Sequence, residues 1–190
     1  MEAVINGKVL ALKLGDISLE SADAIVNSAN SALAGGGAVD RAIRDRGGLA
    51  VIEECGRLGG CNTGYATVSS AGHLDASWII HAVGPVWSGG YDREPSSLAS
   101  AYESSLGRAR EKNVRTIAFP AISTGIFSYP MEAAARIALE KIGEHLSGET
   151  CITRAVMVLY TDDALRIHQM VLEELAKAHD WSVNRGLTGS

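Results

Sequence analysis

The sequence is poor in cysteine and has no long apolar run. Its three cysteines, Cys55, Cys61 and Cys151, cannot form a fully paired disulfide framework, and their spacing matches no zinc site. We expect reduced thiols and no bound metal. No stretch approaches the roughly 20 apolar residues that span a bilayer, and no basic region followed by an apolar signal core opens the chain. These absences predict a soluble, cytoplasmic protein without a membrane partner.

Clusters of basic residues are also missing. The chain carries 17 Lys and Arg against 22 Asp and Glu, a net charge of −5, whereas nucleic-acid binding needs clustered positive charge. A nucleic-acid partner is therefore not expected, although one nucleotide in a neutral pocket is compatible with this charge. The glycine-rich segments match neither the dinucleotide fingerprint nor a P-loop. No Ser-His-Asp set or Cys-His pair is evident, so any catalysis must use positioned water without a cofactor.

What the sequence does contain is an alternation of apolar strands and amphipathic helices. Short apolar runs predict strands at residues 9–14, 24–26, 65–69, 78–83, 116–120 and 155–160. Helical spacing predicts helices at residues 39–47, 49–58, 96–112, 130–146 and 163–178. The alternation predicts an α/β/α layered sheet with mostly parallel strands. We expect a single domain over residues 1–179, a candidate lid at 86–95 and a frayed polar tail at 180–190.

Residues 24–40 form the most informative stretch, because a buried strand there ends in polar and glycine residues. The carboxyl end of the strand should present Asn27 and Asn30 to a crevice, where amides can reach a sugar hydroxyl. The glycines that follow allow positive φ, and their N–H groups can face an anion together with the next helix N-terminus. A triple glycine alone is more often a flexible turn, and Asp40 alone could be an ordinary first-turn acidic residue.

A second loop of the same kind, residues 121–127, also follows a buried strand and precedes a helix. Ser123, Thr124 and Gly125 offer backbone donors and hydroxyls, and Phe127 offers an aromatic edge. Parallel strands would place both loops on one rim, where they could hold a diphosphate from opposite sides. His81, inside an apolar run, is interpreted as a hydrogen-bonded core residue rather than a general base.

Several motifs together carry a family resemblance. They are Gly15-Asp16-Ile17, residues 24–30 ending in Asn-Ser-Ala-Asn, the glycine run to Val39-Asp40, residues 60–64, residues 80–85 and residues 118–127. The chain resembles a macrodomain, the ADP-ribose-binding fold, from about residue 12 to residue 176. It is most similar to the MacroD-type hydrolase branch, which includes bacterial O-acetyl-ADP-ribose deacetylases. The resemblance implies a three-layer α/β/α macrodomain with a mixed, mostly parallel sheet.

The resemblance also implies roles for individual residues. Asp16 would accept a hydrogen bond from the adenine amino group, Asn30 would hold the distal ribose, and Asp40 would orient or activate the attacking water. Asn30 and Asp40 would thus be the catalytic residues. The ligand-binding set implied in this way is Asp16, Ile17, Asn30, Gly35, Gly36, Gly37, Val39, Ser123, Thr124, Gly125, Ile126, Phe127 and Tyr160.

By this resemblance the protein would hydrolyse esters of ADP-ribose. Its substrates would be O-acetyl-ADP-ribose, mono-ADP-ribosylated acidic side chains of proteins, or both. A non-catalytic ADP-ribose reader and an ADP-ribose 1″-phosphate phosphatase remain open alternatives. The chain departs from the family pattern where Ala38 replaces a fourth glycine, where Arg44 stands in place of a histidine, and where Ser128 replaces a glycine.

Overall fold

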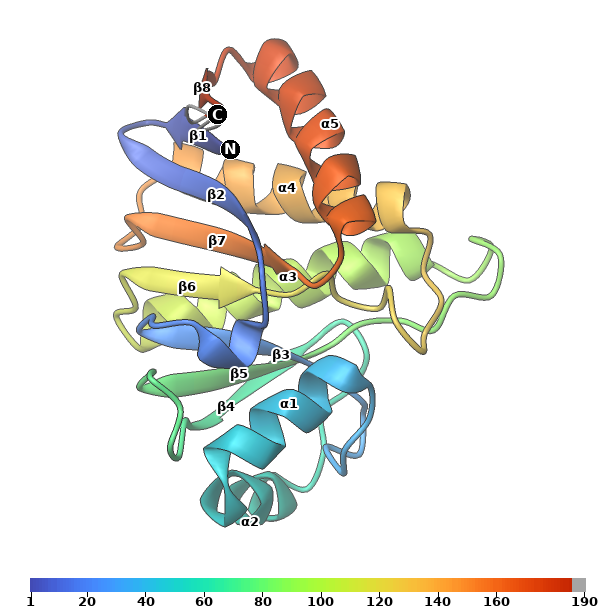
Figure 1. The fold of residues 1–190 in the computed structure, drawn as a ribbon. Helices are drawn as coiled ribbons and strands as arrows, with labels where there is room; N and C mark the ends of the chain where they lie inside the picture. Colours follow the sequence, from blue (N-terminus) through green and yellow to red (C-terminus); the bar gives the residue numbers. More distant parts are fainter. Residues whose placement is uncertain (186–190) are drawn as a thin grey trace.

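The computed structural model of the protein describes residues 1–185, and its central layer is one mixed sheet (Figure 1). Across the sheet the strands follow the order β4-β5-β3-β6-β7-β2-β1-β8. Their bounds are β1 Glu2–Ile5, β2 Lys8–Leu14, β3 Ala24–Ala29, β4 Ala66–Ser70, β5 Trp78–Val83, β6 Thr116–Phe119, β7 Arg154–Leu159 and β8 Ser182–Asn184.

The middle of the sheet is parallel, as the sequence predicted. β5, β3, β6, β7 and β2 pair in parallel, and the antiparallel strands β4, β1 and β8 lie outside them. These central strands consist of apolar runs because both faces of a parallel sheet are covered. Parallel pairing places the carboxyl ends of β2, β3, β6 and β7 on one edge, so the loops that leave them lie together.

Helices cover both faces of the sheet and complete the three predicted layers (Figure 1). α1 (Ala38–Gly47) and α2 (Leu49–Leu58) cover one face, and α3 (Glu94–Glu111), α4 (Met131–Ser147) and α5 (Asp162–His179) cover the other. The alternation of strand side chains builds a separate core on each side. Val26 of β3 packs toward α3 and α4, whereas its neighbour Ile25 packs toward α1 and α2.

Two strands escaped the sequence prediction. β1 pairs with β2 as a hairpin around Asn6-Gly7, and both turn residues have the positive φ that such a tight turn requires. β8 pairs with β1 inside the stretch that we expected to be a frayed tail. The prediction was therefore wrong for Ser182–Asn184, where a polar strand is stabilised by backbone pairing at the sheet edge. Residues 186–190 of the predicted tail lie outside the described residues.

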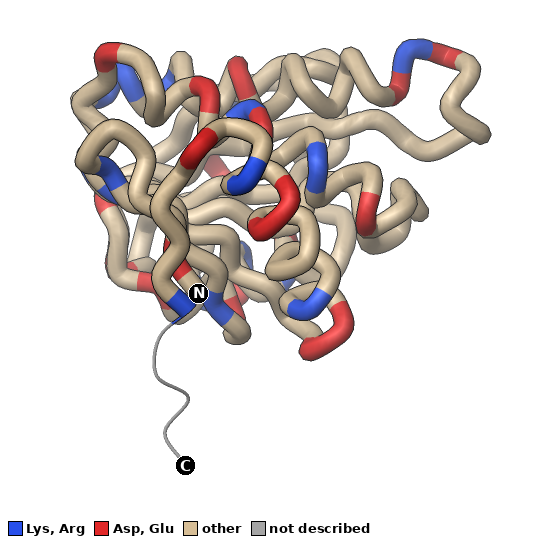
Figure 2. The backbone as a smooth tube through the Cα atoms, turned by 90° about the horizontal axis from the view of Figure 1, so that it is seen from above, with Lys and Arg blue, Asp and Glu red and all other residues tan. Residues whose placement is uncertain are grey.

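Charged residues of both signs are distributed along the whole chain. Figure 2 shows acidic and basic positions interspersed along the backbone. Within residues 1–185, no helix is both long enough and apolar enough to cross a bilayer.

Close packing at Gly143 in α4 generates a stability prediction. A Cβ at this position would overlap the ring of Trp181, the residue that leads into β8. We expect Gly143→Ala to lower the free energy of unfolding by about 1–3 kcal/mol, because overpacking outweighs the gain in helix propensity. Urea unfolding measures the change.

Gly107→Ala in α3 is the matched control, because a Cβ there meets no atom of residues 1–185 within 4 Å. It should raise the free energy of unfolding by roughly 0.5–1 kcal/mol. Equal effects of the two substitutions would contradict the proposed packing of Trp181.

Candidate functional site

A pocket of about 390 Å³ lies at the edge of the sheet where the parallel strands end. Loops that follow β2, β3, β6 and β7 form its walls, and the starts of α1, α4 and α5 complete them. Its lining includes, from the predicted ligand-binding set, Asp16, Ile17, Asn30, Gly36, Gly37, Val39, Ser123, Thr124, Gly125, Ile126, Phe127 and Tyr160. Two predicted residues, Gly35 and Asp40, are not part of this lining.

The glycine loop (residues 30–37) and the second loop (residues 121–127) face each other across the pocket. Ile126 Cγ1 lies 3.8 Å from the point where a Cβ on Gly37 would sit. Within the described residues, the backbone N–H groups of Gly36, Gly37, Gly125, Ile126 and Phe127 have no protein acceptor. Unpaired N–H groups on two facing loops form a concave donor surface that suits an anion.

The second loop is held in a strained conformation from behind. Ser123 has φ 67°, which is uncommon for a residue with a side chain, and such strain persists only where neighbours enforce it. The buried Tyr102 hydroxyl provides part of this support, because it donates to Pro120 O at 3.3 Å and accepts from Ile122 N at 3.2 Å. Gly84 leaves the space that the Ser123 side chain fills. The loop is therefore preorganised.

Asn30 fixes the glycine loop with its side-chain amide. Its Nδ2 donates to Gly35 O at 2.6 Å, and its Oδ1 accepts from Ala34 N at 3.2 Å. An asparagine amide has two N–H donors and two acceptor lone pairs. One donor and one lone pair thus remain for a ligand, and the side chain lines the pocket where they can be used.

Asp16, Ile17 and Tyr160 lie at the β2 and β7 end of the pocket, far along the sheet from Asn30, which follows β3. Asp16 caps a short 3-10 helix by accepting Ser18 N at 2.9 Å through Oδ1. Among residues 1–185, its second carboxylate oxygen has no hydrogen-bond partner. Tyr160 is 79% exposed and presents its ring at the pocket rim.

Asp40 lies behind the glycine loop and is only 1% exposed. Its Oδ2 accepts from Arg44 Nε at 2.9 Å, and its Oδ1 accepts from Asn27 Nδ2 at 2.5 Å. The same Arg44 donates through Nη2 to Leu33 O at 2.7 Å, which ties α1 to the glycine loop. In this conformation Asp40 therefore supports the loop and is not presented to the pocket.

A buried polar network extends from Asp40 away from the pocket. Asn27 is fully buried, so the expectation that it faces the crevice was wrong; in the pleat of β3 its side chain points toward α1. His81 accompanies it, with Nδ1 3.2 Å from Asn27 Nδ2 and Nε2 2.8 Å from Ser69 Oγ. The interpretation of His81 as a hydrogen-bonded core residue is confirmed.

Burial sets the protonation of this network. Desolvation is the main reason that the pKa of His81 is lowered to about 4, and the negative charge of Asp40 opposes it only partly. Burial likewise raises the pKa of Cys55, whose Sγ lies 3.5 Å from His81 Nε2. A neutral imidazole beside a neutral thiol is not an activated pair. Among residues 1–185, no group of three or more His, Cys, Asp or Glu is arranged to hold a metal ion.

The Macro domain family model matches residues 26–138, which include both facing loops. The chain belongs to the macrodomain family. A macro domain-containing protein of Caldanaerobacter subterraneus is 48% identical over 167 residues, which cover 86% of this chain and 95% of that protein. The O-acetyl-ADP-ribose deacetylase of Cronobacter sakazakii is 42% identical over 172 residues, which cover 88% and 95%.

Solved structures agree with this assignment. The Oceanobacillus iheyensis macrodomain with ADP superposes with a TM-score of 0.90 at 34% identity, covering 94% of this chain and 97% of that one. The resemblance inferred from the motifs and the predicted three-layer fold are both confirmed.

Sequence reasoning missed Arg44 as a supporting residue of the site. It noted this arginine as a residue that stands in place of a family histidine, whereas the structure buries it against Asp40 and Leu33. A signal was present, because an acidic and a basic residue at i and i+4 share one face of a helix. Spacing alone could not show that this face is buried.

The buried ion pair generates a prediction about the stability of the macrodomain. Arg44→Met should lower the free energy of unfolding by about 3–5 kcal/mol, because it leaves the Asp40 carboxylate buried without its cation. Combining it with Asp40→Asn should recover at least half of the loss. Denaturant unfolding measures both.

Arg166→Met is the matched control, because Arg166 pairs with Asp163 on the exposed surface of α5. This exposed pair should contribute less than about 1 kcal/mol. A loss in Arg44→Met no larger than in the control would show that the Asp40–Arg44 pair does not stabilise the fold.

His81 generates a prediction about pH. The pKa of His81 has its ordinary value of 6.5 in the unfolded chain and is lowered to about 4 in the folded chain. The unfolded state therefore binds more protons between these values. The contribution of neutral His81 to stability is complete above pH 6.5 and is lost as the pH falls through 4, with a slope of up to ~1.4 kcal/mol per pH unit.

Urea unfolding of the wild type and of His81→Gln across this range measures the slope. The variant should show a shallower slope, with a remainder from His168, whose pKa burial also lowers. Identical slopes would assign the pH dependence to other groups.

Proposed function

We propose that this macrodomain binds ADP-ribose and hydrolyses groups esterified to it. The substrates are O-acetyl-ADP-ribose and mono-ADP-ribosyl groups on acidic side chains of proteins. The observation that carries the proposal is the row of unpaired N–H groups on two facing loops, with the Asn30 amide beside them. The name of the Cronobacter sakazakii relative, an O-acetyl-ADP-ribose deacetylase, supports the same reaction.

The residues at the two ends of the pocket favour one orientation of the ligand. The adenine lies at the β2 and β7 end, where Asp16 accepts from its amino group through the free carboxylate oxygen and Tyr160 packs on the ring. The diphosphate lies between the glycine loop and the second loop, and the distal ribose lies against Asn30 and Phe127. A structure of a Trypanosoma brucei macrodomain in complex with ADP-ribose, 32% identical to this chain, supports this ligand class.

The reaction requires a water held at the ester. Water adds to the ester carbonyl carbon, the acyl–oxygen bond breaks, and the products are the free acid and the ribose hydroxyl. The free N–H and lone pair of Asn30 orient the water and the ribose, and the phosphate of the ligand assists the proton transfer. Fixing the reactants in an attack geometry supplies much of the rate in such a mechanism.

Asp40 acts as a positioning residue in this proposal. Both of its oxygens accept hydrogen bonds from Asn27 and Arg44, so it is poorly placed to take a proton from water. Its Oδ2 lies 3.7 Å from the point where a Cβ on Gly35 would sit, directly behind the loop that Asn30 holds. Asp40 and Arg44 thus set the loop on which the distal ribose rests.

A reader that binds ADP-ribose without hydrolysing it is the second candidate. The burial of Asp40 favours it, because a reader needs no carboxylate exposed to the distal ribose. Turnover of a glutamate-linked mono-ADP-ribosyl protein separates the two functions.

Replacing Asn30 tests whether its side-chain amide orients the water and the ribose for hydrolysis. Asn30→Ala should lower kcat by about 100-fold, the usual cost of removing an oriented hydrogen-bonding group from a reacting centre. Binding of ADP-ribose, measured by calorimetry, should weaken by less than tenfold, because the diphosphate contacts remain.

Asn62→Ala is the matched control, since Asn62 lies on an exposed loop outside the pocket lining. Asn62→Ala should change neither kcat nor the affinity for ADP-ribose. If the wild type binds ADP-ribose but hydrolyses neither ester, the protein is a reader and not a hydrolase. If ADP-ribose does not bind, both functions are excluded.

A further inference from the structure

Residues 86–93, here called the arm, leave the carboxyl end of β5 and extend beyond the helices before α3 begins (Figure 1). The sequence suggested a mobile lid in this region, but the structure shows a segment with many fixed contacts. The base of the arm is anchored in the core. Trp87 packs edge-on against Tyr129, with ring centroids 4.7 Å apart, and its ring covers Gly90.

A single carboxylate fixes the shape of the arm. Glu94 Oε1 accepts from Ser88 N at 2.9 Å, Ser88 Oγ at 2.8 Å and Gly90 N at 3.0 Å, and Oε2 accepts from Asp92 N at 2.6 Å. A hydrogen bond from the backbone N–H of Glu94 itself, with those from Ser88 and Gly90, lowers the pKa of Glu94 to about 2. The carboxylate therefore remains ionised, and the arm remains braced, throughout the neutral range.

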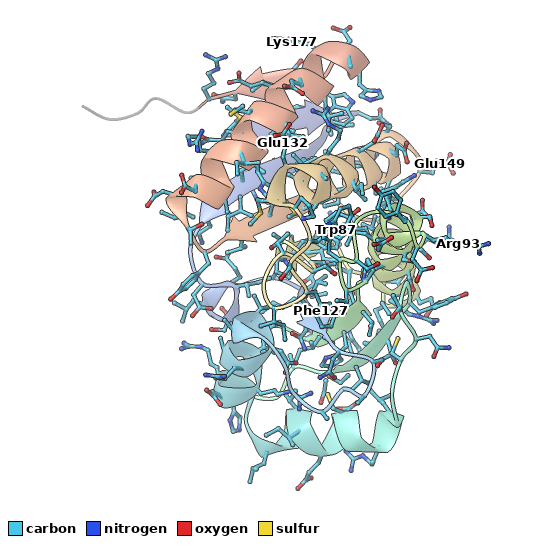
Figure 3. All side chains as sticks on the ribbon, turned by 90° about the vertical axis from the view of Figure 1, so that its right-hand side faces the viewer. Trp87, Arg93, Phe127, Glu132, Glu149 and Lys177 are labelled. Carbon is cyan, nitrogen blue, oxygen red and sulfur yellow. The ribbon has the colours of Figure 1, made fainter. Side chains whose placement is uncertain are left out.

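The strand order sets the side of the pocket on which the arm leaves the sheet. β5 neighbours β3 and is separated from β2 by β3, β6 and β7, so the arm leaves on the side of Asn30, which follows β3, and not on the side of Asp16, which follows β2. Trp87 N donates to Phe127 O at 2.9 Å, which joins the base of the arm directly to the pocket wall. Figure 3 shows Trp87 and Phe127 close together at the centre of this face, with Arg93 standing at its margin.

Apolar side chains are exposed on the arm and on the loop to which it is joined. Tyr91 is 95% exposed at the tip, Val86 is 59% exposed at the base, and Ile126 is 70% exposed on the second loop. A braced segment that presents an aromatic side chain to solvent has the features of a binding surface: low conformational entropy and an amphipathic ring.

We propose that the arm docks the polypeptide to which ADP-ribose is attached, so that the enzyme distinguishes a modified protein from a free ADP-ribose ester. This inference rests on the proposed function. An acetyl group on the distal ribose ends inside the pocket, whereas a polypeptide linked there must leave the pocket at the Asn30 end. The arm is the structure that it meets.

The chemistry of the arm favours a polypeptide over a polynucleotide. Asp92 stands next to Arg93, so the tip carries no excess of positive charge, and the whole chain has a net charge of −5. Binding along a phosphate backbone needs clustered cations. An exposed tyrosine ring, on a segment that also exposes Val86, suits packing against peptide groups and side chains.

Two substrates and one substitution test the proposal. kcat/KM of Tyr91→Ala is measured on a protein mono-ADP-ribosylated on glutamate and on O-acetyl-ADP-ribose. Loss of an anchoring tyrosine should lower kcat/KM on the protein about tenfold, whereas the value on O-acetyl-ADP-ribose should change less than twofold. Tyr91→Phe should retain most of the activity on the protein, because the ring provides the contact.

Leu49→Ala is the matched control, because Leu49 is an exposed apolar residue at the start of α2, outside the arm and the pocket. Leu49→Ala should leave kcat/KM unchanged on both substrates. Equal losses of Tyr91→Ala on both substrates, no loss on either, or a loss confined to an ADP-ribosylated oligonucleotide would overturn the proposal. So would a Tyr91→Phe variant as impaired as Tyr91→Ala.

Failure of the proposed hydrolase function gives a different result, namely no turnover of either substrate by the wild type. The dissociation constants of the modified protein and of free ADP-ribose are then compared. A weakening in Tyr91→Ala confined to the modified protein supports docking on the arm, and an equal or absent weakening rejects it.

Discussion

Parallel pairing of β2, β7, β6 and β3 is the constraint on which the site depends. It brings the ends of four strands, separated by long stretches of sequence, to one edge. The pairing between β3 and β6 stops after Ile25↔Ala118, although β3 continues to pair with β5 as far as Ala29↔Val83. The early end of the β3–β6 ladder leaves room between these two strand ends, and there the two loops face each other.

Charge buried beneath the glycine loop is a second constraint. A charged side chain is stable away from water only when it is paired with an opposite charge and hydrogen-bonded. The Asp40 carboxylate is paired with Arg44 and accepts a hydrogen bond from Asn27, and the Arg44 guanidinium is paired with Asp40 and donates to the Leu33 carbonyl. The loop is thus clamped by α1 from behind and by Asn30 from within. Gly36 and Gly37, whose backbone N–H groups have no acceptor within residues 1–185, are thus fixed in the pocket wall before any ligand arrives.

Preorganisation by buried polar groups recurs around the rim. The Tyr102 hydroxyl braces the second loop, and the Glu94 carboxylate braces the arm. In each case one side chain satisfies several backbone groups that the irregular segment cannot pair by itself. Rigid presentation lowers the entropy lost on binding, so the pocket and its neighbouring surface are suited to recognise a ligand without rearranging.

The sequence by itself determined the types and order of the helices and long strands from β2 to α5, because local apolar periodicity, glycine and turn residues act over a few positions. It also placed Asn30, Gly36 and Ser123 on strand-end loops of one rim, since parallel α/β topology leaves few alternatives. Only the tertiary structure decided that Asn27 and Asp40 turn inward, that Arg44 is buried, and that polar β8 joins the sheet. The direction of a side chain and the pairing of an edge strand depend on partners distant in sequence, and local pattern carries no record of them.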